Sequence, residues 1–330
     1  MRIARFLPIV AAAVTLGSGP PAPTAPPAPL PPLPGTGVLR APADPEKFSF
    51  VVMGDNRPAT PGTGQTETVG RIFEAARARH ADFVLSTGDT IFGRDPGHPA
   101  LIEKEYAEYL LLARRAGVPV FNAPGNHESD DSTDVPAEVM QQLYQKFMGP
   151  LYGAFDYGNS HFIALDTEEI AFSPLGLSRR AIPPSGPSLD PGYVGPEQLS
   201  WLKRDLDASR AKAHVFVFMH HSIKARDKSF ALDGGSAYAL EEIFRGRRNI
   251  SYILAAHEHL YYNPLGRTGI EPPPPRTDPS TEPPVYLVTG GAGAPLSGKP
   301  EEGGFFHYLV VHVDGSRVSA ELVRLPPGGN

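Results

Sequence analysis

The chain has no cysteine, which excludes disulfide bonds, thiolate nucleophiles and zinc sites with cysteine ligands. It also lacks an excess of positive charge, because 30 Lys and Arg residues face 36 Asp and Glu residues, for a net charge of −6. Such a chain offers no general attraction to nucleic acid or to an anionic membrane surface. We therefore expect no nucleic-acid polymer as a partner, and we expect any phosphorylated ligand to be attracted by local groups.

Long hydrophobic runs are also lacking. The apolar stretch from Phe6 to Leu16 is about half of the ~20 residues that a membrane-spanning helix needs. Arg2 and Arg5 precede it and small residues follow at 17–19, an order typical of a secretory signal peptide. We expect residues 1–19 to be a signal peptide, the protein to be periplasmic or secreted, and no stable membrane span to be present.

Proline is plentiful in the next segment. Residues 20–34 hold nine prolines, which leave few backbone donors and little to pack, so residues 20–46 are predicted to be an extended proline-rich spacer. From residue 47 to residue 330, apolar runs with strand periodicity alternate with segments of helical periodicity, which indicates one α/β domain. Strands are expected at 48–54, 83–88, 118–123, 152–157, 161–167, 214–219, 250–256, 285–289, 306–313 and 317–324, and helices at 66–80, 100–116, 136–148, 196–210 and 236–245.

Side chains of the kind that bind metals follow five of these predicted strands. Because the carboxyl ends of parallel strands meet at one edge of a sheet, we expect the side chains to form a single site. Carboxylate and amide oxygens together with imidazoles suit Mn, Fe, Zn or Mg. The pattern indicates a hydrolase with two metal ions. The residues concerned are Asp55, Asp89, Asn126, His220, His257 and His259.

The order of these motifs resembles the calcineurin-like metallophosphoesterase superfamily over residues 48–325. The motifs are Gly54-Asp55-Asn56-Arg57, Gly88-Asp89, Gly125-Asn126-His127-Glu128, His220-His221 and His257-Glu258-His259. The glycine turn at 290–293 resembles the purple-acid-phosphatase-like branch in particular. The resemblance implies an α/β (α+β) fold that is a four-layer αββα sandwich of two mixed β-sheets flanked by helices, with the metals at the strand ends.

The resemblance also implies a division of ligands between two divalent or trivalent metal ions. Asp89 is expected to bridge both ions, since a carboxylate has two oxygens to offer. Asp55 and His259 are expected to complete the first site, and Asn126, His220 and His257 the second.

The same resemblance implies the catalytic roles. A hydroxide activated by both metals is expected to attack phosphorus, with His127 as the general acid that protonates the leaving group. Either Glu128 or Asp131 is a candidate to orient His127. His221 is expected either to contact the substrate or to pack behind the ligands.

The sequence departs from the family pattern at two positions. The first motif usually ends in His, and here Arg57 occupies that position; the tyrosine ligand of purple acid phosphatases is replaced by Phe92. We therefore expect a more weakly held first metal, with Asn56 as a candidate extra oxygen ligand. Arg57 is expected to clamp a phosphate oxygen or to form a structural ion pair. A clamping cation would favour a dianionic monoester over a diester.

These observations favour an exported metal-dependent phosphoesterase that hydrolyses a small phosphomonoester. One alternative is a phosphodiesterase that acts on cyclic nucleotides or small diesters, and another is a non-catalytic metal- or phosphate-binding protein. Asn126 is also a candidate substrate contact, together with Arg57 and His221. The long loops at 168–195 and 263–284 are expected to set specificity. The oligomeric state stays open.

Overall fold

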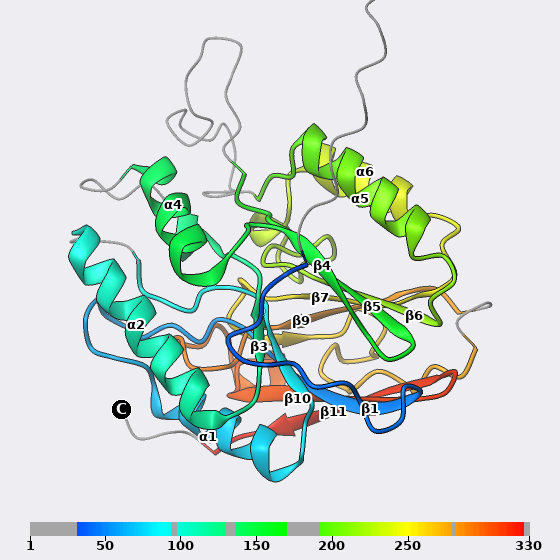
Figure 1. Ribbon diagram of the computed structural model, residues 1–330, viewed down its shortest axis with the longest axis horizontal. Helices are drawn as coiled ribbons and strands as arrows, with labels where there is room; N and C mark the ends of the chain where they lie inside the picture. The colour runs from blue at the N-terminus through cyan, green and yellow to red at the C-terminus, as the bar shows by residue number, and fades with distance from the viewer. Residues whose placement is uncertain (1–31, 94–97, 130–135, 170–191, 279–281, 327–330) are drawn as a thin grey trace, which may run out of the picture. The chain divides into compact units, whose positions relative to one another are not determined.

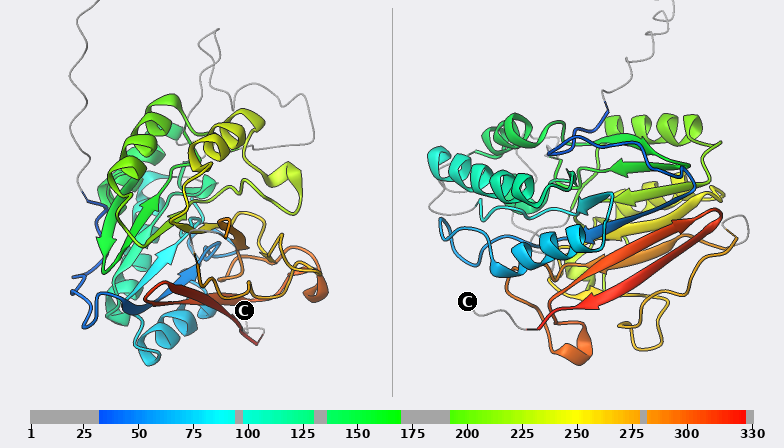
Figure 2. Two further views of the ribbon diagram at one scale, coloured as in Figure 1. Left: turned by 90° about the vertical axis from the view of Figure 1, so that its right-hand side faces the viewer. Right: turned by 60° about the horizontal axis from the view of Figure 1, so that its bottom comes forward.

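The computed structural model describes residues 32–93, 98–129, 136–169, 192–278 and 282–326. In this part of the chain two β-sheets pack face to face, and helices cover both outer faces (Figure 1, Figure 2). The expected four-layer αββα sandwich is therefore confirmed. The predicted signal peptide at 1–19, the start of the predicted spacer and most of loop 168–195 lie outside the described residues.

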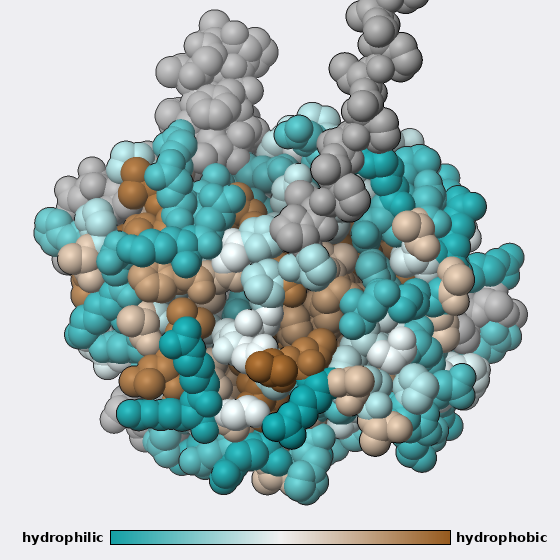
Figure 3. All heavy atoms as spheres, viewed as in Figure 1, coloured by the Kyte–Doolittle hydropathy of each residue, from teal (hydrophilic) through white to brown (hydrophobic). Residues whose placement is uncertain are grey.

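The first sheet has five strands in the order β11-β10-β1-β2-β3, with β1, β2 and β3 parallel and β10 and β11 antiparallel. Three helices pack on its outer face through a shared hydrophobic cluster. Hydrophilic and hydrophobic side chains are interleaved on the outer side of this helix layer (Figure 3). The elements are β1 (Lys47–Met53), β2 (Phe83–Ser86), β3 (Val120–Asn122), β10 (His307–Asp314), β11 (Arg317–Arg324), α1 (Glu67–Ala78), α2 (Pro99–Ala116) and α4 (Ala137–Met148).

The second sheet has six strands in the order β4-β5-β6-β7-β9-β8, and its inner four strands, β5, β6, β7 and β9, are parallel. Two helices cover its outer face. No helix in the described ranges is long and apolar enough to cross a membrane. The elements are β4 (Gly153–Tyr157), β5 (Ser160–Ala164), β6 (His214–Phe218), β7 (Ile250–Ala255), β8 (Tyr261–Tyr262), β9 (Val285–Thr289), α5 (Pro196–Ala208) and α6 (Gly234–Phe244), with the short helices α3 (Asn126–Ser129), η2 (Lys228–Phe230) and η3 (Pro300–Glu302) in loops.

Aromatic side chains fill the space between the two sheets. Alternation along β1 sends Phe50 into this inner core and Val51 toward the helices. The Phe50 ring packs edge-on against Phe162 and Phe216 of the second sheet, with ring centroids 5.3 and 5.1 Å apart. Each such pair contributes roughly 0.5–1.5 kcal/mol beyond burial of its area. The packing fixes one sheet against the other, and therefore fixes the relative positions of their strand ends.

The folded part of the chain begins before Lys47, where the sequence places only a spacer. Leu33 is 4% exposed and donates its amide to the carbonyl of Ala154 on β4, at 2.9 Å. The amide of Thr36 donates to the carbonyl of Val120 on β3, at 3.0 Å. This segment thus pairs with one edge strand of each sheet, β4 in the second and β3 in the first. Proline content alone gives no sign of it, because the contacts depend on strands that lie far away in the sequence.

The loop at 263–284 reaches the amino-terminal end of β7, and the candidate metal ligands follow the opposite, carboxyl end of this strand. Arg276 is 2% exposed and donates to the carbonyls of Ile250 and Ser251, at 2.9 and 2.6 Å. These residues begin β7, so Arg276 lies about 17 Å along the strand from its carboxyl end. The expectation that this loop sets specificity is therefore wrong for its Arg276 portion.

A histidine on β5 joins three elements of the second sheet and its helix layer. His161 Nδ1 lies 2.6 Å from Asp156 Oδ1 on β4, and its Nε2 lies 2.8 Å from Asp205 Oδ2 on α5. Burial lowers the pKa of His161, but the two carboxylates outweigh burial and raise it above its ordinary value. The protonated ring therefore contributes stability that is complete below the unfolded-state pKa and is lost as pH rises through the folded-state pKa.

We predict that His161→Ala lowers the free energy of unfolding by about 1 kcal/mol more at pH 6 than at pH 9, a modest value because Asp156 is half exposed. Urea unfolding of metal-free protein at both pH values measures this difference. His312→Ala, at an exposed position of β10, is the matched control. An equal loss at both pH values for His161→Ala would show that the ion pairs add nothing.

Candidate metal centre

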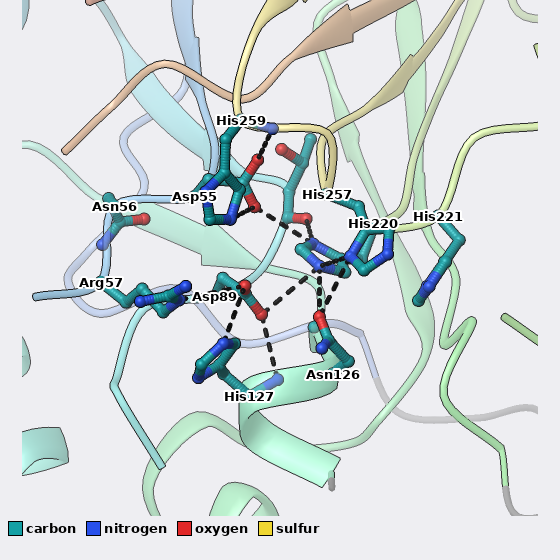
Figure 4. A network of polar contacts seen from close by, with 12 residues as sticks. Asp55, Asn56, Arg57, Asp89, Asn126, His127, His220, His221, His257 and His259 are labelled. Carbon is teal, nitrogen blue, oxygen red and sulfur yellow. Dashed lines mark hydrogen bonds and ion pairs between the residues drawn. The ribbon is translucent and has the colours of Figure 1, made fainter. Parts of the chain in front are cut away.

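The predicted ligands come together at the carboxyl edges of the two sheets. In Figure 4 they converge on one region, to which loops from both sheets contribute. One compact group consists of Asp55, Asp89 and His220, whose candidate ligand atoms all lie within 4.8 Å of one another. Asp55 follows β1, Asp89 follows β2, Asn126 begins α3 after β3, His220 follows β6, and His257 and His259 follow β7.

The backbone is strained at four of these residues. Among the described residues other than glycine, five have a positive φ, and four of the five are candidate ligands. A left-handed conformation at such residues costs of the order of 1 kcal/mol each and persists only where surrounding contacts fix it. The strain turns each side chain sharply out of the end of its strand. The four ligands are Asp55 (54°), Asp89 (58°), His257 (72°) and His259 (51°).

Two glycines let the chain approach the carboxylates closely. A Cβ atom on Gly125 would lie 2.4 Å from Asp89 Oδ1, and a Cβ on Gly290 would lie 2.1 Å from Asp55 Oδ2. Both distances are too short for any side chain. Gly290 belongs to the turn after β9. In the same turn the amides of Ala292 and Ala294 donate to the carbonyls of Gly54 and Asp55. The glycine motifs therefore serve to close the backbone around the two carboxylates.

Three ligand atoms form a tight triangle on one side of the site. Asn126 Oδ1 lies 2.9 Å from His220 Nε2 and 3.2 Å from His257 Nδ1, and the two ring nitrogens are 3.1 Å apart. Asp89 Oδ1 lies 3.4 Å from His220 Nε2. Ligands about 2.1 Å from one octahedral ion are about 3 Å apart, so this triangle has the spacing of a metal site.

The other side of the site is more open. His259 Nε2 lies 3.9 Å from Asp55 Oδ1. Within the described part of the chain, neither Asp55 Oδ1 nor Asp89 Oδ2 receives a hydrogen bond, although both residues are at most 1% exposed. A buried carboxylate oxygen without a donor is costly unless a cation compensates for it. The residues present therefore fit a metal ion next to Asp55 as well as one within the triangle.

Backbone carbonyls orient the histidines. His220 Nδ1 is 2.9 Å from the carbonyl of Thr87, and His259 Nδ1 is 2.7 Å from the carbonyl of Pro295. Each carbonyl accepts the Nδ1 proton, which directs Nε2 toward the carboxylates. These contacts fix both the tautomer and the rotation of each ring before any ligand binds.

Burial and charge shift the protonation of the site in opposite directions. Burial raises the pKa of Asp55, with partial compensation by His259 and His220. Burial also acts to raise the pKa of Asp89, but the positive charges of His220, His127 and Arg57 outweigh it and hold that pKa below its ordinary value. Burial lowers the pKa of His220, but Asp89 and Asp55 raise it to about 9. The site thus concentrates negative charge that local cations neutralise.

Residues 48–261 match the sequence profile of the family described as calcineurin-like phosphoesterase. The chain belongs to this family. No curated protein matches the chain. This phosphoesterase is therefore a metal-dependent hydrolase of phosphoesters.

Solved structures with little sequence identity share its fold. A dimetal phosphatase from Danio rerio superimposes with a TM-score of 0.61 at 14% identity, covering 84% of this chain and 96% of that one. A purple acid phosphatase from yellow lupin gives 0.60 at 16% identity, covering 86% of this chain and 53% of that one. GAP50, described as the anchor in the inner membrane complex of Plasmodium, gives 0.51 at 14% identity, covering 86% of each.

His127 and Arg57 lie beside Asp89 in the phosphoesterase. His127 Nδ1 is hydrogen-bonded to the carbonyl of Phe92, and its Nε2 lies 3.9 Å from Asp89 Oδ2. Arg57 Nε lies 3.6 Å from the same oxygen, its Nη1 donates to the carbonyl of Pro58 at 3.1 Å, and its guanidinium faces the Phe92 ring. An imidazole and a fixed cation therefore border the oxygen of Asp89 that receives no hydrogen bond from the described residues.

His221, expected either to contact the substrate or to pack behind the ligands, is fully buried. Its Nδ1 is 2.6 Å from Glu168 Oε1 and its ring centroid is 3.8 Å from that of His257, so it packs behind a candidate ligand. Asn56 Oδ1 accepts from the Ser86 hydroxyl at 3.3 Å, and Figure 4 shows this side chain away from the other ligands. Strand alternation and local backbone direction decide both placements.

Glu128 does not orient His127; it binds backbone amides instead. Its two oxygens accept from the amides of Asp89, Thr90, Ile91 and Gly125 at 2.6–3.2 Å, and from the Thr90 hydroxyl at 2.9 Å. The carbonyl of Phe92 contacts His127 Nδ1, and Asp131, the other candidate to orient His127, lies outside the described residues. A backbone carbonyl has no signature in sequence, so no residue pattern could have identified it.

We predict that Glu128→Gln weakens metal binding by about 10- to 100-fold, because the amide nitrogen cannot accept the hydrogen bonds that align Asp89 with Asn126. Calorimetric titration of metal-free protein with Mn²⁺ or Zn²⁺ measures this change.

Glu105→Gln is the matched control, since Glu105 is 2% exposed and also accepts two backbone amides, those of Gly62 and Gly93. That variant should lose thermal stability and keep its metal affinity. Equal metal affinity in wild type and Glu128→Gln would contradict the alignment role.

Proposed function

We propose that this phosphoesterase hydrolyses small phosphomonoesters with two metal ions, and that it is exported by the signal at residues 1–19. The observation that carries the proposal is Asp89, whose Oδ1 adjoins the triangle of ligand atoms while its Oδ2 faces Arg57 and His127. Metal ions, a charge clamp and a proton donor are the parts that phosphoryl transfer needs.

The ligand assignment follows from the two sides of the site. Asp55 and His259 would hold one ion, Asn126, His220 and His257 would hold the other, and Asp89 would contact both. Mn, Fe, Zn or Mg all suit this donor set. When bound, such ions supply Lewis acidity toward the phosphoryl oxygens and an activated water as nucleophile.

His127 would act as the general acid. The Phe92 carbonyl accepts its Nδ1 proton, so in the imidazolium form the second proton is on Nε2, which faces the site. Asp89 Oδ2 lies 3.9 Å from that nitrogen. His127 can therefore deliver a proton from Nε2 to the departing alkoxide.

Arg57 supports a monoester over a diester substrate. It is a permanent cation, its side chain is only 12% exposed, and the Phe92 ring and the Pro58 carbonyl fix its position. A phosphomonoester carries one more negative charge than a diester at neutral pH, so a fixed guanidinium beside the phosphoryl group binds it more strongly. The phosphodiesterase alternative has no comparable observation in its favour.

The non-catalytic alternative draws support from the fold it shares with GAP50, which is described as an anchor. A protein that only binds metal or phosphate has no need of a proton donor held in one orientation. His127, with Nδ1 bonded to Phe92 and Nε2 toward Asp89, therefore favours an enzyme.

We predict that the Mn²⁺-loaded protein turns over p-nitrophenyl phosphate at least 10-fold faster, in kcat/KM, than bis(p-nitrophenyl) phosphate. Asp89→Asn, which removes the shared carboxylate, should abolish both activities. Faster diester turnover would favour the phosphodiesterase, and wild-type rates in Asp89→Asn would refute the ligand assignment.

We predict that Arg57→Gln lowers kcat/KM for the monoester by about 10- to 100-fold and lowers the diester value several-fold less, because the dianion loses a stronger charge interaction than the monoanion does. Arg79→Gln is the matched control, since Arg79 pairs with Glu321 at 2.7 Å on the surface. A parallel loss for both substrates in Arg57→Gln would mean that Arg57 merely maintains the position of Asp89.

A further inference from the structure

An exposed aromatic ring stands beside the candidate metal centre. Phe230 is 41% exposed, and its ring centroid lies 5.5 Å from that of His257 at an interplanar angle of 65°. Within the described residues, the other large exposed hydrophobic side chains are Val38, Leu111, Tyr238 and Leu265. Tyr238 is the aromatic residue among those four, and it makes no ring contact with a candidate metal ligand in the described part of the chain.

The segment 222–232, which carries Phe230, is held in place by the motif His257-Glu258-His259, which carries two candidate ligands. Glu258, between His257 and His259, accepts the amides of Arg226 and Asp227 at 2.9 and 2.8 Å. Asp227 in turn accepts the Ser229 amide at 2.9 Å and starts the short helix that ends at Phe230.

Both ends of the segment are also tied together. Ser222 and Ala231 form a β-bridge, and the Leu232 amide donates to the Ser222 carbonyl at 3.1 Å. Arg226 reaches across to the carbonyl and the carboxylate of Glu302. Because these contacts hold the loop in one conformation, the Phe230 ring cannot move into the core and stays exposed. Such pre-organisation lowers the entropic cost of binding a partner.

Phe230 lies next to His257, a candidate ligand that is itself partly exposed. The carboxylates of Asp55 and Asp89 are at most 1% exposed, whereas the His259 side chain is 16% exposed and His257 is partly exposed. The second aromatic ring near the site, Phe92, already packs against Arg57 and His127. Of these two rings, Phe230 is the exposed one beside a candidate ligand.

We propose that Phe230 is a specificity-determining residue that stacks on a planar aromatic part of the leaving alcohol. The substrate class would then be phosphomonoesters whose alcohol part carries an aromatic or heteroaromatic ring. The ring is either bonded directly to the phosphate oxygen or attached through a sugar. Offset stacking of two rings favours the aromatic substrate over an aliphatic one of equal charge by roughly 3- to 10-fold. This inference rests on the proposed phosphomonoesterase function.

The test compares kcat/KM for p-nitrophenyl phosphate, adenosine 5′-monophosphate and glycerol 3-phosphate on the Mn²⁺-loaded full chain. In Phe230→Leu, which keeps an apolar side chain but loses the ring, the aromatic-to-glycerol ratio should fall about 3- to 10-fold, and Phe230→Tyr should restore it. A loss confined to p-nitrophenyl phosphate identifies a ring next to the phosphate, and a loss confined to the nucleotide identifies one beyond a sugar.

Tyr238→Leu is the matched control, because Tyr238 is an aromatic residue, 65% exposed, on α6. A second readout needs no turnover: the affinities of phenylphosphonate and methylphosphonate, measured by calorimetry, should differ in wild type and converge in Phe230→Leu. Unchanged ratios and affinities in Phe230→Leu, or an equal change in Tyr238→Leu, would overturn the inference while leaving the phosphomonoesterase intact. A wild-type protein that turns over none of the three monoesters would overturn both.

Discussion

The hydrogen bonds that backbone amides donate to the buried carboxylate of Glu128 are the interaction on which the site depends. It binds the amides of the loop that follows β2 and the amide of Gly125 before α3, and so joins the two turns that present Asp89 and Asn126. Burial, together with the charge of Asp89, raises its pKa to about 7, even though the backbone amides act to lower it. An ionised carboxylate with this many donors is strongly bound, and the same group without them would destabilise the fold.

Rigidity around the site makes a strained backbone possible. The left-handed conformations at Asp55, Asp89, His257 and His259 are each unfavourable by themselves. They are offset by an inner core in which Phe50, Phe162 and Phe216 lock one sheet against the other. The result is a triangle of atoms from Asn126, His220 and His257 that lie about 3 Å apart, the spacing of a metal site.

The sequence predicted the layers, and which candidate ligands come together, better than it predicted the contacts that support them. Asp55, Asp89 and His220 follow strands with clear apolar periodicity, and such strands in parallel leave only one edge where their ends can meet. Phe92, by contrast, contributes a carbonyl oxygen, and Leu33 contributes packing between strands that are more than 80 residues away. Neither contribution depends on a side-chain pattern that can be recognised along the chain.

The sequence by itself determined which candidate residues follow the strands, because residue type and strand periodicity are local properties. Only the tertiary structure decided how those residues are used. It turned His221 toward Glu168, set Arg57 between Asp89 and Phe92, and brought Phe230 to His257 through Glu258. The physical reason is that these contacts join separate loops, whose relative positions are fixed by the packing of two sheets and not by any neighbouring residue.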